Sequence, residues 1–385
     1  MVMYGVNSTF GVFFKPLSTD LAWTRAMTSG AFSLSWIVHG SLSIVIGGLT
    51  DRFDPRIVLT ICGVLLGLGY LLMSQISTVW QLYLFYGVVI GTGLSGGFIT
   101  LMPTIAKWFV KRRSMVTGIV LAGSGIGTLI APPIANQLIS IYDWRLSYII
   151  LGGMALVLVV SAAQFLRRDP TQKGQMPYGE SEGEEKGLKF ETKAFSLKKA
   201  VSTRQFWLVF IMFFGLGYGA STVMVHIVPH ATDLGISAAS AANILAIFGG
   251  LSVIGRVVLG IAGDKIGNRQ VLIIGFALIA AASFYLMPAT DTWALYLFAA
   301  VFGFAFGGCV ASESPIVAVL FGLSSHGLIL GVIVLGFSIG AAIGSFVTGY
   351  IFDIAASYQV AFLVCAAISV VALISTVILT PTKTS

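Results

Sequence analysis

One arginine of this sequence lies deep within an apolar stretch. Arg256 stands in the run 238–262, eight residues before Asp264, so as part of a helix it lies about 12 Å from the polar loop that follows. A charge at the centre of a membrane helix costs roughly 2.5–3.5 kcal/mol, and a guanidinium stays charged and presents a planar pair of donors to a carboxylate. Arg256 is therefore predicted to bind an anion, and pairing with a backbone carbonyl is the alternative.

Few other ionisable side chains occur in the apolar stretches. Glu313 is well placed within such a stretch and is either a proton carrier or a gate residue bonded to a helix end. Lys15 stands near the end of the first stretch, where a lysine can extend its ammonium group to the interface. Asp233 and His226 flank the end of the seventh stretch and could pass protons near neutral pH. His39, in the middle of the second stretch, is predicted to be a hydrogen-bonded packing residue.

Further candidates lie at a similar depth. Hydroxyl and amide groups there could hydrogen-bond a 2-hydroxyl group of a bound molecule, and apolar side chains could form a wall that selects small acyl groups. The polar candidates are Tyr4, Asn7, Tyr218 and Ser338, and the apolar candidates are Leu121, Phe304, Phe306 and Phe337. Depth alone supports this set, because the direction of each side chain depends on how the helices pack.

The composition places these residues in a membrane protein. Hydrophobic residues make up 57% of the 385 residues and charged residues 10%, against roughly 45–50% and about 25% in a soluble domain. Apolar stretches of about 20 residues can cross the hydrocarbon core as helices. They span 1–18, 25–48, 57–74, 80–107, 114–138, 146–166, 204–228, 238–262, 270–287, 292–316, 325–350 and 357–380. The sequence therefore predicts an all-α membrane protein with twelve transmembrane helices.

The net charge of +7 reflects the orientation of these helices in the membrane. Most of the 22 Lys and Arg residues lie in every second connection and in the long central one. The positive-inside rule places those connections in the cytoplasm, together with both termini, so the charge does not indicate a nucleic-acid partner. The three cysteines, Cys62, Cys309 and Cys365, lie in apolar stretches and are predicted to be packing residues.

A polar loop recurs 213 positions along the chain. It follows the second and the eighth predicted helix and combines an aspartate with two basic residues, namely Asp51, Arg52 and Arg56 in the first copy and Asp264, Lys265 and Arg269 in the second. An aspartate there can bind an arginine or cap a neighbouring helix, and so form a cytoplasmic gate. The repetition indicates two duplicated bundles that bind a substrate between them. The predicted division is a bundle at 1–166, a cytoplasmic linker at 167–203 and a bundle at 204–385.

Several local motifs resemble those of one family. They are the runs 10–17 and 23–25, Trp108-Phe109 with 111–113, 122–127 with Pro132-Pro133, and 226–237 followed by 254–256. With the repeated loop, the chain resembles the major facilitator superfamily, and within it the monocarboxylate transporters and their bacterial relatives, including the oxalate:formate antiporters. The resemblance implies two six-helix bundles, a small monocarboxylate such as lactate or pyruvate carried with a proton, and a Lys15 that receives the incoming anion.

Two positions depart from that family. Animal monocarboxylate transporters carry an aspartate one helical turn before the intramembrane arginine, where this sequence has Ser252, so another group must carry the proton. The oxalate-type antiporters hold a dicarboxylate with a second cation in helix eleven, whereas the run 328–348 contains no Lys or Arg. One buried cation favours a monocarboxylate over oxalate.

The resulting hypothesis is a proton-coupled monocarboxylate symporter that works by alternating access, as a monomer surrounded by lipid in the inner (plasma) membrane. An anion exchanger of the oxalate:formate type is the alternative. An enzyme is not expected, because the four histidines are scattered and no catalytic cluster or metal-binding motif occurs. No cofactor or metal is implied. Because the chain opens almost inside its first helix, a few native residues are expected to precede Met1.

Overall fold

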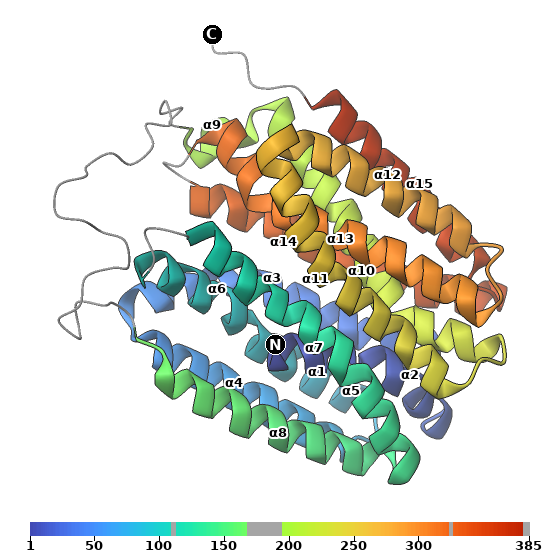
Figure 1. Cartoon of the computed structure of the whole chain (residues 1–385). Coiled ribbons are helices and arrows are strands. Elements are labelled where there is room, and N and C mark those ends of the chain that lie inside the picture. The colour runs from blue at the N-terminus through green and yellow to red at the C-terminus, as the bar shows by residue number, and fades with distance from the viewer. Residues whose placement is uncertain (109–112, 168–194, 323–325, 380–385) are drawn as a thin grey trace.

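The computed structural model describes residues 1–108, 113–167, 195–322 and 326–379, which form helices joined by short connections (Figure 1). The helices up to residue 165 are α1 (Val2–Ser8), α2 (Phe10–Asp20), α3 (Arg25–Arg52), α4 (Pro55–Met73), α5 (Val79–Leu82), the π-helix η1 (Tyr83–Ile90), α6 (Gly91–Trp108), α7 (Arg113–Ile141) and α8 (Trp144–Phe165). Those that follow are α9 (Leu197–Val201), α10 (Arg204–Asp233), α11 (Ala238–Ile266), α12 (Asn268–Leu286), α13 (Thr292–Phe321), α14 (His326–Ala355) and α15 (Gln359–Ile378).

When helices that continue one another are counted together, the described helices form twelve membrane-spanning segments. The first segment consists of α1 and α2, which meet at Thr9, and the fourth consists of α5, η1 and α6, which follow one another without a gap. Short α9 lies between the sixth and seventh segments. Among the described residues, nine single helices are long and apolar enough to cross a membrane. The predicted class, an all-α membrane protein with twelve transmembrane helices, is confirmed.

Polar residues in the connections set where many of these helices begin. The side chains of Thr24, Asp54, Asp143, Thr203 and Ser237 each accept a hydrogen bond from a backbone N–H in the first turn of the following helix. Such caps satisfy donors that a helix cannot satisfy internally. The local sequence of each connection therefore fixes the start of the next spanning segment.

The two halves of the molecule repeat one packing pattern. In the first half, α3 packs against α6 and η1, α4 against α8, and α1 against α7. In the second half, α11 packs against α13, α12 against α15, and α10 against α14. Each pair of the second half stands six spanning segments after its counterpart, so the predicted pseudo-symmetric six-helix bundles are present. The predicted domain boundaries stay a prediction, and most of the predicted linker, residues 168–194, lies outside the described residues.

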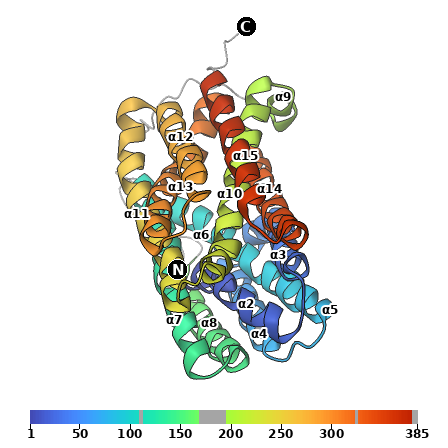
Figure 2. The ribbon, with the colours of Figure 1, turned by 90° about the vertical axis from the view of Figure 1, so that its right-hand side faces the viewer.

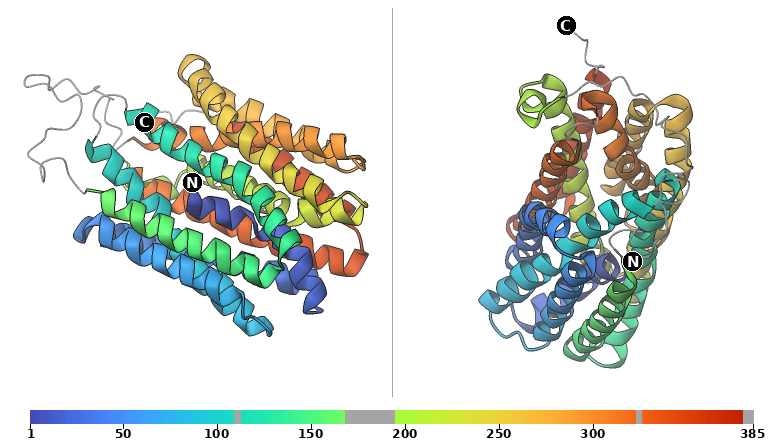
Figure 3. Two further views of the ribbon diagram at one scale, coloured as in Figure 1. Left: turned by 60° about the horizontal axis from the view of Figure 1, so that its bottom comes forward. Right: turned by 90° about the vertical axis from the view of Figure 1, so that its left-hand side faces the viewer.

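The halves meet along three pairs of helices, α3 with α14, α7 with α11, and α2 with α10 (Figures 2 and 3). Glycines allow the backbones to approach closely. A Cβ atom on Gly40 of α3 would lie 2.8 Å from the side chain of Ser338 of α14, and one on Gly249 of α11 would lie 2.6 Å from the backbone nitrogen of Leu129 of α7. Small residues commonly mediate such crossings in membranes, and here they hold the two halves around a shared interior.

Candidate functional site

A cavity of about 500 Å³ lies between the two halves. Its walls come from α1, α3 and α7 of the first half and from α10, α11, α13 and α14 of the second, among other elements, and most side chains in them are apolar. The volume lies within the ~300–1,000 Å³ that is usual for a ligand pocket. Of the described residues in its lining, Arg256 is the sole Lys or Arg and Glu313 the sole Asp or Glu.

The guanidinium of Arg256 reaches from α11 in the second half to α7 in the first. Its Nη1 donates to the hydroxyl oxygen of Ser124 at 2.8 Å and to the backbone carbonyl of Leu121. Its Nε is buried and has no hydrogen-bond partner among the described residues. Both partners are neutral, and a guanidinium has five donors. The carbonyl contact expected as the alternative is thus present, and it leaves donor capacity for an anion.

Glu313 of α13 lines the same cavity. Its Oε1 is buried and has no hydrogen-bond partner among the described residues, so no bond from this oxygen to a helix end is seen in that part of the chain. A buried carboxyl group without a donor is costly in its charged form. Arg256 and Glu313, the anion-binding and proton-carrying candidates predicted within the membrane, therefore share one cavity.

The remaining predicted candidates divide into two sets. Those that line the cavity are Tyr4, Asn7, Leu121, Phe306 and Phe337, and those outside its lining are Phe304, Tyr218 and Ser338. Tyr218 is 2% exposed and packs where Gly344 of α14 approaches its backbone. The side chain of Ser338 faces Gly40 of α3. Both sets were predicted at a similar depth, and the rotation of each helix in its bundle separates them.

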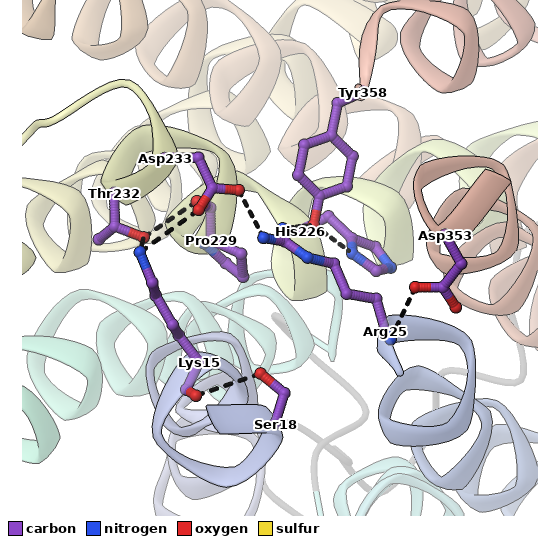
Figure 4. A network of polar contacts seen from close by, with 9 residues as sticks. All are labelled: Lys15, Ser18, Arg25, His226, Pro229, Thr232, Asp233, Asp353 and Tyr358. Carbon is purple, nitrogen blue, oxygen red and sulfur yellow. Dashed lines mark hydrogen bonds and ion pairs between the residues drawn. The ribbon is translucent and has the colours of Figure 1, made fainter. Parts of the chain in front are cut away.

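An ion-pair network joins the two halves at the end of the molecule where α2 meets α3, which we call the distal end (Figure 4). The carboxylate of Asp233, at the end of α10, lies 3.3 Å from Nζ of Lys15 and 2.6 Å from Nη2 of Arg25. Lys15 also donates to Oγ1 of Thr232 at 3.4 Å. Two predicted candidates, Lys15 and Asp233, thus meet each other, and one carboxylate of the second half holds two cations of the first.

Arg25 extends this network into the second half. Its Nη1 donates to the hydroxyl oxygen of Tyr358, and its guanidinium carbon lies 3.6 Å from the ring centroid of Phe352. The backbone N–H groups of Arg25 and Ala26 donate to the carboxylate of Asp353 at 2.9 and 2.8 Å. Asp353 of α14 therefore binds the N-terminus of α3, where a negative charge is favourable. Local sequence patterns do not reveal these roles, because Arg25 and Asp353 are 328 positions apart in the chain.

His226 of α10 lies next to the network and is fully buried. Its Nε2 lies 2.8 Å from the carbonyl oxygen of Ser345 and must donate to it, so in a neutral ring Nδ1 accepts from the hydroxyl of Tyr358 at 3.2 Å. Both ring nitrogens are therefore used within the second half. The structure places this candidate outside the cavity lining, in a position that fixes α10 to α14.

The repeated loop lies at the opposite end of the molecule, which carries residues 167 and 195 and which we call the linker end. The side chains of Asp51, Arg52 and Asp264 lie outside the described residues. Arg56 binds Asp54, with Nη2 3.1 Å from Oδ2. Burial would raise the pKa of the Asp54 carboxyl, but hydrogen bonds from Arg56 outweigh it and lower that pKa. Arg269 donates to carbonyl oxygens at the end of α15, and Lys265 is exposed. These contacts stabilise each half internally.

Comparison with known proteins decides the family. The model described as Major Facilitator Superfamily matches residues 1–229 and 209–385, which together cover the chain. The chain belongs to the Major Facilitator Superfamily. This major facilitator protein is therefore a multi-pass membrane transporter and not an enzyme.

Relatives of this transporter match most of its length. It is 28% identical over 342 residues to the uncharacterised MFS-type transporter YhjX of Escherichia coli (strain K12), a match that covers 86% of this chain and 81% of the relative. It is 26% identical to monocarboxylate transporter 12 of Mus musculus, covering 94% and 79%, and 27% identical to monocarboxylate transporter 4 of Gallus gallus, covering 94% and 76%. The predicted resemblance to the monocarboxylate transporters is confirmed.

Solved structures show the same fold. A bacterial homologue of the human lysosomal transporter Spinster, in an inward-facing and unoccupied conformation, superimposes with a TM-score of 0.72 at 14% identity. The match covers 98% of this transporter and 92% of that chain. At this identity the likeness concerns the arrangement of the helices, so the site must be interpreted from the residues of this chain.

Proposed function

We propose that this transporter moves a small monocarboxylate, such as lactate or pyruvate, together with a proton by alternating access. The observation that carries the proposal is the position of Arg256, a cation with an unpartnered Nε in a cavity between the two halves. A guanidinium in a mostly apolar pocket suits a carboxylate. Relatives named as monocarboxylate transporters support the same substrate class.

The number of charges in the cavity supports one carboxylate rather than two. Arg256 is the single Lys or Arg among the described lining residues. A dicarboxylate held there would keep one uncompensated negative charge in a low-dielectric site, which is costly. An exchanger of the oxalate:formate type is therefore the less favoured candidate, and the experiment below distinguishes it.

Glu313 is the proposed carrier of the proton. With Arg256 charged and Glu313 ionised, the empty cavity has no net charge. A bound carboxylate adds one negative charge, and a proton on Glu313 removes one, so the fully loaded cavity is again neutral. A cavity that held only the anion or only the proton would carry a net charge. Moving that charge across the membrane interior costs free energy. The requirement for a neutral cavity would thus couple transport of the anion to transport of the proton.

In the proposed cycle the bundles at 1–166 and 204–385 rock about the cavity. The distal network of Lys15, Arg25 and Asp233 then holds the distal end closed in the conformation described above and must break when that end opens. The orientation of the basic loops supports a cytoplasmic linker end in an inner membrane. We propose that a monomer is sufficient, because the cavity lies within a single chain.

The test is uptake of radiolabelled L-lactate and pyruvate into proteoliposomes that contain the purified transporter, with an inward proton gradient. The wild type is compared with Arg256→Lys, which keeps the charge but not the planar fork, and with Arg256→Gln, which removes the charge. We expect gradient-stimulated uptake in the wild type, uptake reduced at least about tenfold in Arg256→Lys, and none above empty liposomes in Arg256→Gln.

Two outcomes would overturn parts of this proposal. Uptake that needs an internal anion and ignores the proton gradient would establish the exchanger instead. Uptake that is the same in the wild type and both variants would place the anion elsewhere. Folding of each variant is checked by its elution as a single species in detergent, so that loss of transport is not confused with loss of structure.

A further inference from the structure

Two aromatic side chains of α3 bring unsatisfied polar atoms to the cavity. Trp36 and His39 both line it, and both also line a smaller recess beside it. The indole Nε1 of Trp36 and the Nδ1 of His39 are buried and have no hydrogen-bond partner among the described residues. His39 is only 7% exposed. The packing role predicted for His39 therefore leaves one of its ring nitrogens without a partner.

Both residues border a small recess beside the main cavity. The recess is bounded by Tyr4, Asn7, Ser35 and Leu94 in addition to the two aromatic residues, and it has no room for a water molecule. Buried polar groups without partners are rare in proteins because they are costly. Two such atoms, three residues apart on one helix and next to the same cavity, indicate a binding function rather than a packing accident.

A third group adds to the same place. Asn7 of α1 is 2% exposed, and its Oδ1 accepts a hydrogen bond from the hydroxyl of Tyr86 at 3.1 Å. Tyr86 belongs to the π-helix η1, a form that often occurs at functional sites. The bond uses the acceptor of the amide, and no hydrogen bond from the Asn7 amide nitrogen is seen in the described part of the chain. The first half thus presents mainly donors to this side of the cavity.

The surrounding rings hold the pair in a defined position. The ring of Trp36 meets His39 edge-on, with centroids 5.2 Å apart, and meets Phe337 of α14 edge-on at 5.6 Å. Gly40, which follows His39, brings α3 against Ser338 of the same helix α14. Trp36 and His39 therefore stand on the helix that contacts the second half, so a rearrangement of the halves changes the space in front of them.

We propose that Trp36 and His39 form a second substrate subsite, which binds a hydrogen-bond acceptor on the organic group of the monocarboxylate. This inference rests on the proposed function, in which Arg256 binds the carboxylate. An indole N–H can only donate, so its partner must be an acceptor such as a carbonyl or hydroxyl oxygen. The substrate class is thus narrowed to carboxylates with an oxo, hydroxyl or amide oxygen, and purely alkyl acids are disfavoured. A substrate held at both places bridges the two halves.

The test compares two acids of nearly equal shape, 4-oxopentanoate and 4-methylpentanoate, in which a carbonyl oxygen replaces a methyl group. Their equilibrium affinities for the purified full-length transporter in detergent are measured by titration calorimetry at one pH. We expect the wild type to bind the oxo acid about tenfold more tightly, and Trp36→Phe to bind both acids about equally. The matched control is Trp293→Phe, at an 81% exposed position, which should keep the wild-type ratio. His39→Phe is the second variant and should also lower the ratio.

The outcomes separate this inference from the function on which it rests. Equal affinities for both acids in the wild type, with binding abolished by Arg256→Gln, would overturn the second subsite alone. Binding that is insensitive to Arg256→Gln would overturn the proposed function and the subsite with it, and no binding of either acid would overturn the subsite alone. A ratio that is unchanged in Trp36→Phe or, where that variant does not yield folded protein, in His39→Phe would also refute the role of this pair.

Discussion

Arg25 and Asp233 join the two halves of the transporter across the distal end, with Nη2 of the guanidinium 2.6 Å from Oδ2 of the carboxylate. Arg25 is the first residue of α3 and Asp233 the last of α10. Their side chains are 16% and 30% exposed. Ion pairs with such access to water are usually weak, which suits a contact that has to form and break in each cycle of the alternating access proposed above.

Asp233→Asn is expected to shift the transporter towards conformations that are open at the distal end. The amide keeps the shape of the carboxylate but removes the charge that attracts both Lys15 and Arg25. The measurement is the distance distribution between spin labels on cysteines at Thr19 and Ala239, two exposed positions, in a background without native cysteines. We expect a population of longer distances that is at least a few times larger than in the wild type.

The control for that variant is Asp143→Asn, because Asp143 caps α8 within the first half and asparagine caps a helix about equally well. It should leave the distances unchanged. Identical distance distributions in Asp233→Asn and the wild type would mean that the ion pairs do not hold the distal end closed.

Gly11→Ala is expected to impair the closed distal end by a steric route. A Cβ atom at Gly11 of α2 would overlap the carbonyl oxygen of Met224 of α10, which is backbone and cannot turn aside. The two helices would have to separate, and we expect initial uptake to fall by about tenfold. Gly153→Ala is the control, because nothing lies within 4 Å of the added atom. Normal uptake by Gly11→Ala would contradict the requirement for close approach of α2 and α10.

Glu313→Gln is expected to separate proton coupling from anion binding. An amide cannot release a proton, so uptake driven by the proton gradient should be lost. Exchange of labelled for unlabelled lactate across the membrane should persist, because the Arg256 site is intact and the cavity can reorient with the anion bound. Both processes are measured in the same proteoliposomes, with Asp291→Asn in an exposed connection as the control. Retention of gradient-driven uptake would assign the proton to another group.

Tyr86→Phe is expected to lower the stability of the first half by about 1 kcal/mol. The change removes the hydrogen bond to Oδ1 of Asn7 and leaves that buried acceptor without a partner. Thermal unfolding in detergent, followed by the loss of the monodisperse species, provides the measurement. The control is Tyr142→Phe, at a 56% exposed position. A Tyr86→Phe protein as stable as the control would show that this bond does not stabilise the bundle.

Much of the fold could be predicted because the relevant signals are local. Helices in a membrane must satisfy their own backbone hydrogen bonds, so twelve apolar stretches translate directly into twelve spanning segments. The two copies of the Asp51 loop indicated the duplication because a repeat of residue types is visible in the sequence itself. Arg256 could be identified as a binding candidate because a charge in such a stretch is expensive wherever the helix packs.

The site was predicted only in part, because depth does not give direction. Tyr4, Asn7 and Phe337 line the cavity, whereas Tyr218 and Ser338, which have comparable positions along their helices, do not. One turn of a helix presents side chains in all directions, so a small rotation of the helix decides which of them meets a ligand. This rotation is set by how the helices pack, so it cannot be read from the sequence alone.

By itself, then, the sequence determined the number of spanning segments, their duplication and the position of Arg256 within the membrane, since each of these signals lies in residues near one another in the chain. The tertiary structure alone decided that Arg256 and Glu313 share a cavity, that Trp36 and His39 border it, and that Arg25 meets Asp233. These contacts join positions up to 208 residues apart. They depend on how the two bundles pack, which no local preference of the chain encodes.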